Sequence, residues 1–230
     1  MFFVNVVTQT PGTGREDKKL KKLKLSMTDT VSLVRNITLA ARCVSNVETV
    51  IIHDLCLGRE EWEVLGKVLA SKEKTLKRLE LFQILGVTED NIAEIALCIV
   101  SVPEVRLSSF CSIPLFWSAI SHAVLSQENN QLGLLEVVST SVQPQSLASF
   151  CQCVLAIPQV RLMKVKLGES WSRLVEELTS SDKVVSKLWL TECWIPDQVV
   201  EQLHSLDSWG VGTEEGGTLL NNNYIVLNKM

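Results

Sequence analysis

The side chains best able to ligate a metal or to act in acid–base catalysis are three histidines and seven cysteines. His53 falls in a predicted strand, whereas His122 and His204 fall in predicted helices far apart in the chain. No two histidines have the spacing of a metal-ligand pair, no Cys-x-x-Cys occurs, and Cys151 and Cys153 are separated by one residue. Because no nucleophile, base and metal ligand come together, the sequence predicts no catalytic residue, cofactor or metal, and hence no enzyme.

Cysteine and tryptophan recur at nearly constant intervals instead. One cysteine row is spaced by 55 and 55 residues and one tryptophan row by 55 and 54; the members are Cys43, Cys98, Cys153 and Trp62, Trp117, Trp171. Rows of this kind are typical of side chains that pack at equivalent places in stacked units. We expect both rows to be buried, and the alternatives are a redox-sensing thiol row and an exposed aromatic ridge.

Short apolar runs of the form Leu-x-x-Leu-x-Leu keep the same period. In one set the middle anchors are 56, 56 and 53 residues apart, and in a second, interleaved set they are 55 and 55 apart; the anchors are Leu23, Leu79, Leu135 and Leu188, then Val50, Val105 and Val160. Each run alternates like a half-buried strand, and segments such as 60–69 have the apolar spacing of an amphipathic helix. Strands that alternate with helices lie parallel, because the helices form the crossover connections.

This pattern resembles the leucine-rich repeats of the ribonuclease-inhibitor type, which also form the C-terminal region of the NOD-like innate immune receptors. The resemblance implies an α/β solenoid, a horseshoe with a parallel concave β-sheet and convex helices, built here from about seven repeats of two alternating types. The family's Asn/Cys turn position is matched only by Cys193; its other occupants are Thr28, Leu55, Ile84, Phe110, Thr140 and Val165. The backbone of those turns therefore needs other hydrogen-bond partners.

The repeats divide the chain into three parts. Residues 1–19 form a lead-in or N-terminal cap, 20–210 the leucine-rich repeats, and 211–230 a capping tail that contains a strand at Tyr224–Leu227. Phe2–Val7 could instead be a strand of an earlier repeat. Trp194 and Trp209 are expected to pack beneath the tail, because solenoids need a cover over their last strand.

Composition excludes several classes of protein. The 230 residues are 46% apolar, with 22 basic and 26 acidic side chains and a net charge of -4, which fits neither a disordered chain nor a nucleic-acid binder. No apolar run reaches the roughly 18 residues of a membrane span, and no signal peptide is evident. With an odd number of cysteines, we expect a cytoplasmic protein. Residues 1–30 carry 6 basic and 3 acidic groups, either as a solvated surface or as a contact for an acidic partner or lipid.

A partner is expected on the concave face, where alternate strand side chains point into solvent. The predicted partner-binding residues are Ile51, His53, Phe82, Arg106, Arg161, Met163 and Trp189. Opposite charges on neighbouring strands, Glu80/Arg106 and Glu136/Arg161, are expected to pair. Phe82, Met163 and Trp189 would be exposed apolar groups unless a tail or a neighbouring copy covers them.

Two functions follow from the resemblance. The first is a non-catalytic, ligand-sensing or scaffold module of the innate-immune type that binds a protein partner. The alternative is a protein inhibitor of an enzyme, like the ribonuclease inhibitor, although a net charge of only -4 and a self-paired concave row would attract a basic ribonuclease only weakly. The identity of the partner and the oligomeric state stay open.

Overall fold

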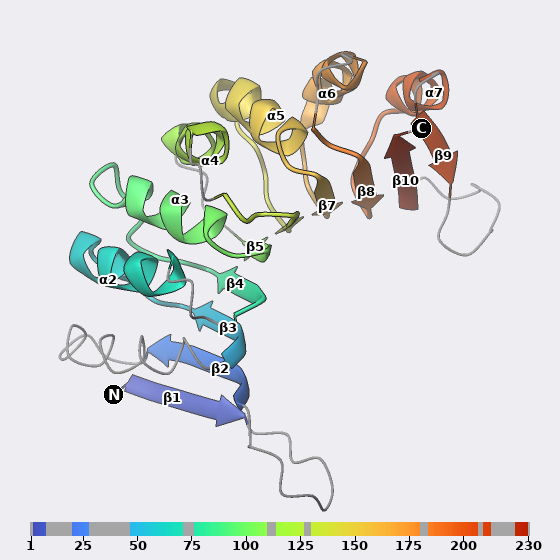
Figure 1. Ribbon diagram of the computed structural model, residues 1–230. Helices are drawn as coiled ribbons and strands as arrows, with labels where there is room; N and C mark the ends of the chain where they lie inside the picture. The colour runs from blue at the N-terminus through green and yellow to red at the C-terminus, as the bar shows by residue number, and fades with distance from the viewer. Residues whose placement is uncertain are drawn as a thin grey trace, which may run out of the picture.

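The structure is a computed structural model that describes residues 2–7, 20–27, 47–70, 76–109, 114–126, 130–179, 184–206, 209–212 and 224–229. These residues form a curved two-layer α/β arrangement, with one continuous sheet on the inner side of the arc and helices along the outer side (Figure 1). The predicted α/β class with a mostly parallel sheet is confirmed.

The described part of the sheet has ten strands in the order β1-β2-β3-β4-β5-β6-β7-β8-β10-β9. Their bounds are β1 (Phe2–Val7), β2 (Leu20–Met27), β3 (Val47–His53), β4 (Arg78–Phe82), β5 (Glu104–Ser108), β6 (Leu134–Val138), β7 (Gln159–Met163), β8 (Lys187–Thr191), β9 (Trp209–Gly212) and β10 (Tyr224–Lys229). Strands β2 to β8 pair in parallel in chain order, as the helical crossovers require.

The strand register follows the apolar anchors of the sequence. Leu23 of β2 is paired with Val50 of β3, Val50 with Leu79 of β4, and the alignment continues through every parallel strand to Leu188 of β8. None of the seven anchors is more than 1% exposed. A slip of one residue would turn this apolar row toward solvent, so burial of the anchors specifies the register.

Helices cover the outer face of the sheet. They are α2 (Arg59–Ala70), α3 (Ile92–Val100), α4 (Pro114–Ser126), α5 (Leu147–Leu155), α6 (Trp171–Leu178) and α7 (Asp197–His204), with 3-10 turns η1 (Pro144–Ser146) and η2 (Gly168–Ser170) before α5 and α6. The predicted tryptophan row is fully buried, as expected, and its members belong to three helices: Trp62 to α2, Trp117 to α4 and Trp171 to the start of α6. The Trp171 indole Nε1–H donates to the backbone oxygen of Trp194 at 2.8 Å.

The cysteine row is buried where the structure describes it. Cys98 and Cys153 are fully buried in α3 and α5, and the third member, Cys43, lies outside the described residues. Burial raises the pKa of the Cys153 thiol to about 12 and, with the nearby carboxylate of Glu94, also raises the pKa of Cys98. These two thiols therefore behave as small apolar core groups.

This predicts sharply different thiol reactivity within one chain. In the native protein at pH 8, a maleimide or iodoacetamide reagent is expected to modify the exposed Cys56 rapidly and to leave Cys98 and Cys153 unmodified. The reason is that both reagents attack through the thiolate, which is scarce well below the pKa and inaccessible in the core. Peptide mapping by mass spectrometry, before and after unfolding in guanidinium, assigns each site. Modification of Cys153 at a rate close to that of Cys56 would contradict the core assignment.

Each strand from β3 to β8 is followed by one residue with a left-handed backbone. The φ angles lie between 46° and 55°, and the residues are Asp54, Gln83, Ser109, Ser139, Lys164 and Glu192. From Asp54 to Lys164, the backbone N–H of this residue donates to the carbonyl at the end of the next strand at 2.8–3.1 Å. These bonds extend the hydrogen-bond ladder of the sheet by one residue. They supply backbone partners in turns where the side chains at the family's Asn/Cys position are mostly apolar and cannot form hydrogen bonds.

Two side chains at the turn position nevertheless bond to the backbone. The Cys193 Sγ contacts the Leu162 and Thr191 oxygens at 3.3 and 3.5 Å, and the Thr140 hydroxyl donates to the Val138 oxygen at 3.1 Å. Leu55, Ile84 and Val165 are buried instead, whereas Thr28 and Phe110 lie outside the described residues.

Antiparallel strands flank the parallel array at both ends. The predicted C-terminal strand is present as β10, which pairs with β8 and in turn with β9, and Trp209 at the start of β9 is 3% exposed. The expectation for Trp194 is wrong, because its side chain is 79% exposed, although its backbone oxygen accepts a hydrogen bond from Trp171. Strand β1 runs antiparallel to β2, unlike the strand of an earlier repeat.

Candidate interaction surface

The concave face is defined here by three rows of positions on the parallel strands, which point away from the helices. The registers align Lys22, Thr49, Arg78, Glu104, Leu134, Gln159 and Lys187 in the first row; Lys24, Ile51, Glu80, Arg106, Glu136, Arg161 and Trp189 in the second; and Ser26, His53, Phe82, Ser108, Val138, Met163 and Thr191 in the third. All seven predicted partner-binding residues belong to the second and third rows.

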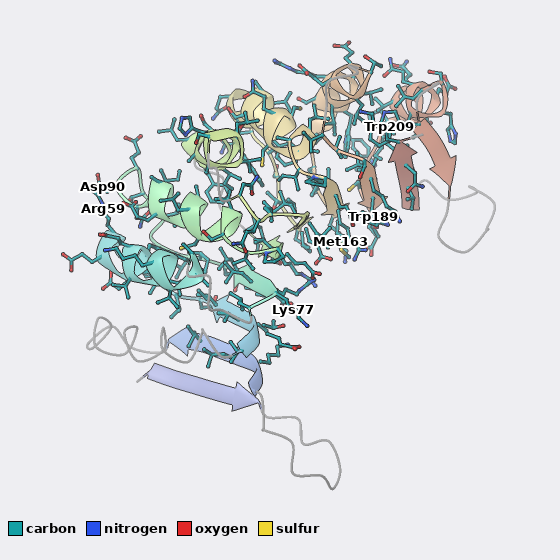
Figure 2. The ribbon with its side chains drawn as sticks, viewed as in Figure 1. Arg59, Lys77, Asp90, Met163, Trp189 and Trp209 are labelled. Atoms are coloured by element: carbon teal, nitrogen blue, oxygen red, sulfur yellow. The ribbon has the colours of Figure 1, made fainter. Side chains whose placement is uncertain are left out.

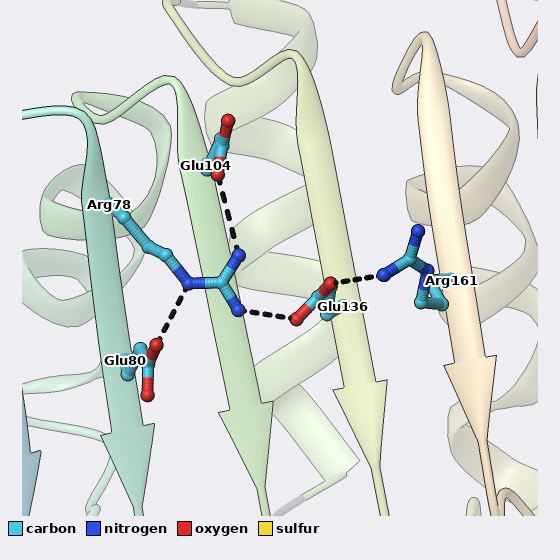
Figure 3. A network of polar contacts seen from close by, with 5 residues as sticks. All are labelled: Arg78, Glu80, Glu104, Glu136 and Arg161. Atoms are coloured by element: carbon cyan, nitrogen blue, oxygen red, sulfur yellow. Dashed lines mark hydrogen bonds and ion pairs between the residues drawn. The ribbon is translucent and has the colours of Figure 1, made fainter.

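Five charged side chains form one network across the centre of this face (Figure 3). The Arg78 guanidinium donates from Nε to Glu80 at 2.8 Å, from Nη1 to Glu104 at 3.4 Å and from Nη2 to Glu136 at 2.6 Å. The other oxygen of Glu136 accepts from Arg161 Nη1 at 3.0 Å. The planar fork of arginine suits this task, since it can direct donors to three carboxylates on three strands.

Glu136 is the most deeply placed member of the network, at 4% exposed. Burial by itself disfavours the charged Arg78 guanidinium, but the hydrogen bonds and charges of Glu80 and Glu136 outweigh that effect, so the pKa of Arg78 lies above its ordinary value. Each of the five charged side chains therefore has an oppositely charged partner within the network.

One of the two expected charge pairs is present. Glu136 pairs with Arg161, but Glu80 is taken by Arg78 rather than by Arg106. Arg78 is not among the predicted site residues, and it lies before the two anchors Leu79 and Leu81 at the start of β4. The alternation of side chains along a strand was the available signal, since Arg78 lies two residues before Glu80 and so shares its face.

Three of the predicted residues lie together on the neighbouring strands β3, β4 and β5. The guanidinium carbon of Arg106 is 5.7 Å from the centre of the Phe82 ring, and the rings of His53 and Phe82 are 5.8 Å apart. All three side chains are only partly buried, and the Arg106 Nε atom is buried without a hydrogen-bond partner. His53 Nδ1 also contacts the Asp54 carboxylate at 2.6 Å. We call this group the His53–Phe82–Arg106 cluster.

Two predicted residues are not exposed. Trp189 is 4% exposed because Arg161 and Lys187 lie over its ring, at 4.8 and 4.4 Å from the centroid, and Val226 of β10 is beside it in register. Ile51 is 7% exposed. The prediction that both present apolar surface to solvent is therefore wrong, whereas Met163 stays partly exposed. Figure 2 shows Trp189 and Met163 near each other on the inner side of the arc.

The remaining chemistry-bearing residues stay apart from one another. His122 Nδ1 forms a hydrogen bond with the hydroxyl of Ser126 on its own helix at 3.4 Å, and His204 ends α7 on the outer layer. Across the described ranges, no three His, Cys, Asp or Glu side chains are grouped to hold a metal ion. Of the basic run at 15–24, Lys22 and Lys24 belong to the concave face, and 15–19 lies outside the described residues.

Neither a protein-family model nor a curated protein matches this chain. None of the helices in the described residues has the length and apolar character needed to cross a bilayer.

Proposed function

We propose that the chain is a leucine-rich repeat module of the ribonuclease-inhibitor type, with seven repeats in two alternating forms, that binds a protein partner on its concave face. The alternating 55-residue spacing of the anchors and the helical crossovers on the outer side support this class. The resemblance to the NOD-like receptors is the reason to propose a ligand-sensing or scaffold role. Free thiols at all five described cysteines support a cytoplasmic location.

The His53–Phe82–Arg106 cluster is the observation that carries the proposal. A few residues supply most of the binding energy at a protein interface; tryptophan, tyrosine and arginine are enriched among them, and phenylalanine is enriched at interface cores. The cluster is partly exposed, has one arginine nitrogen without a partner, and adjoins a charged network that is already satisfied. A partner can therefore gain contacts with the cluster without breaking the network.

The charge of the face indicates the chemistry of the partner. Its described positions hold six basic side chains and three carboxylates; the basic ones are Lys22, Lys24, Arg78, Arg106, Arg161 and Lys187, and the carboxylates are Glu80, Glu104 and Glu136. An acidic partner surface complements this excess, whereas a basic enzyme such as a ribonuclease does not. The charge of this face therefore counts against a basic ribonuclease as the partner.

The proposal predicts a face-specific loss of binding. In quantitative affinity capture from cells, Phe82→Ala with Arg106→Gln is expected to weaken capture of the specific partner at least about tenfold, because hot-spot truncations cost about 2 kcal/mol or more. The matched control is Leu115→Ala with Arg173→Gln, which makes the same kinds of change at exposed positions of α4 and α6.

The comparison separates the concave face from the outer layer. Proteins lost with the concave variant and kept with the control are partners of this face, and their binding is then remeasured with purified components. If every captured protein is retained by the concave variant, or lost equally with both variants, the concave face is not the binding surface. Circular dichroism shows that both variants are folded.

A further inference from the structure

A row of four exposed side chains runs along the outer surface of α4. Their 3-4-3 spacing is that of a coiled-coil seam, which puts all four on one face of the helix; they are Leu115, Ser118, His122 and Leu125. The two leucines are 47% and 68% exposed, and both polar residues are exposed as well. We call this row the α4 stripe. It is about 15 Å long, with an apolar side chain at each end and polar ones between them.

The α4 stripe borders a groove between α3 and α4. The groove has a volume of about 430 Å³, and its walls are mostly small or apolar; they include Ala93, Ala96 and Leu97 of α3 and Ala119 and Ala123 of α4. Three members of the stripe line the groove as well. Because the side chains at a contact set how closely two helices can approach, these alanines leave room for another helix.

This part of the outer layer carries almost no charge. Helices α4 and α5 contain no Asp, Glu, Lys or Arg, although these residues make up 21% of the chain. Helix α3 contains only Glu94, which is paired with Arg59, whereas α6 holds Arg173, Glu176 and Glu177 within eight residues. Amphipathic helices bind membrane surfaces partly through basic side chains, and a charged protein partner needs opposite charges. The α4 surface offers neither, so another uncharged surface complements it best.

The α4 stripe has the same pattern in both directions along the helix. Its two leucines and its two polar residues are each centred on position 120. Across a two-fold axis at that position, an antiparallel second copy places its Leu125 against Leu115 and its His122 against Ser118. His122 Nδ1 is bonded to the Ser126 hydroxyl of its own helix at 3.4 Å, so Nε2 can bond to the Ser118 hydroxyl of the second copy. The stripe is therefore complementary to itself.

We propose that the chain forms a two-fold symmetric homodimer, in which the α4 stripe packs antiparallel on the α4 stripe of a second copy. The outer layer is convex (Figure 1), so two copies touch over a small area, at the low end of the size range for specific interfaces. We expect a weak dimer, with a dissociation constant on the order of 10 µM. Both concave faces stay open, so the dimer is bivalent. This bivalency, unlike the dimer itself, rests on the function proposed for the concave face.

Sedimentation velocity of the full chain tests the self-association, at concentrations from about tenfold below to about tenfold above that constant. Leu115→Glu and Leu125→Lys are each expected to weaken the dimer at least about tenfold, because each buries charges against leucines of the second copy. A negative charge near the start of α4 and a positive charge near its end also suit the helix dipole, so both variants should fold. Leu85→Glu, at a leucine that is 57% exposed and outside α4, is the matched control and should dimerise like the unmodified chain.

A mixture of the two charged variants tests the antiparallel arrangement. In a heterodimer of Leu115→Glu with Leu125→Lys, the introduced glutamate lies opposite the introduced lysine, and the two unmodified leucines lie opposite each other. The mixture is therefore expected to dimerise at least about tenfold more tightly than either variant alone. In a parallel arrangement each residue would face its own equivalent, both charges would stay against leucine, and mixing would restore nothing.

Three results would overturn the proposal. They are a chain that stays monomeric over the whole range, a dimer that neither charged variant weakens, and a mixture no tighter than its components. If the chain is monomeric and floats with phosphatidylcholine vesicles, and Leu125→Lys does not float, the stripe contacts lipid instead. In affinity capture the chain is diluted far below the dissociation constant of the dimer, so the Leu115→Ala control of the concave-face test keeps its purpose and the two proposals fail separately.

Discussion

Trp117→Ala is expected to lower the free energy of unfolding by about 3–5 kcal/mol, the cost of deleting a large side chain from a packed core. Trp117 is fully buried in α4 and makes edge-on contacts with the rings of Phe116 and Phe150, at 5.2 and 4.8 Å between centroids. Phe150 belongs to α5, so the substitution also opens the contact between two neighbouring helices. The measurement is urea denaturation followed by circular dichroism.

Trp194→Ala is the matched control for this substitution. The same atoms are removed, but the Trp194 side chain is 79% exposed, and the backbone oxygen that accepts from Trp171 is retained. We expect a change within about 0.5 kcal/mol, as for other surface substitutions. Because units in a stacked array contact mainly their neighbours, hydrogen exchange in Trp117→Ala should rise first in α4 and α5. Similar losses for the two variants would show that Trp117 is not a core residue.

Arg78→Met is expected to cost about 2–3 kcal/mol, since it removes the donor shared by three carboxylates. Glu136 would keep its contact with Arg161, and Glu80 would lose its contact with Arg78 on the same strand. Breaking a buried ion pair costs more than the pair itself contributes, because the remaining charge stays desolvated. The length of methionine preserves most of the packing along the strand, so the loss reports on the charge. Chemical denaturation at neutral pH measures it.

Lys77→Met, a substitution at the residue before Arg78, is the control. Lys77 also pairs with a carboxylate, Glu48, at 3.3 Å, but both side chains are well exposed, at 69% and 42%, so the expected change is within about 0.5 kcal/mol. Lys77, labelled in Figure 2, lies one residue before the start of β4. Adding Glu136→Gln to Arg78→Met should recover part of the loss, because it removes one uncompensated charge. A loss in Arg78→Met no greater than in Lys77→Met would mean that the network contributes nothing to stability.

The positions of the parallel strands were predictable because their anchors are local and periodic. Leu23, Val50 and Leu79 could be aligned from their spacing alone, and the structure pairs them. The exposure of the concave side chains was harder to predict, because it depends on neighbours from other strands. Trp189 reads as an exposed strand residue, but Arg161 and Lys187 cover its ring.

The long-range ion pairs also depend on contacts between elements that lie far apart in the sequence. Arg78 reaches Glu136 across an intervening strand, and Glu94 meets Arg59 from another helix. Such contacts arise only when the curved array brings these elements together, so the residue spacing carries no signal for them. A C-terminal strand was predicted at Tyr224–Leu227 from its apolar run and is present as β10, although its position between β8 and β9 was not predicted.

The left-handed residues that follow β3 to β8 have a consequence for how such a chain can evolve. Their identities are Asp, Gln, Ser, Ser, Lys and Glu, so what recurs is a backbone angle and not an amino acid. Substitutions among polar residues can accumulate there while each turn keeps its course, but a β-branched residue would be selected against. Residue identity agrees at only two of these six positions, Ser109 and Ser139, even though the main chain repeats at all six. At these positions, backbone conformation is therefore a better guide to common ancestry than amino-acid identity.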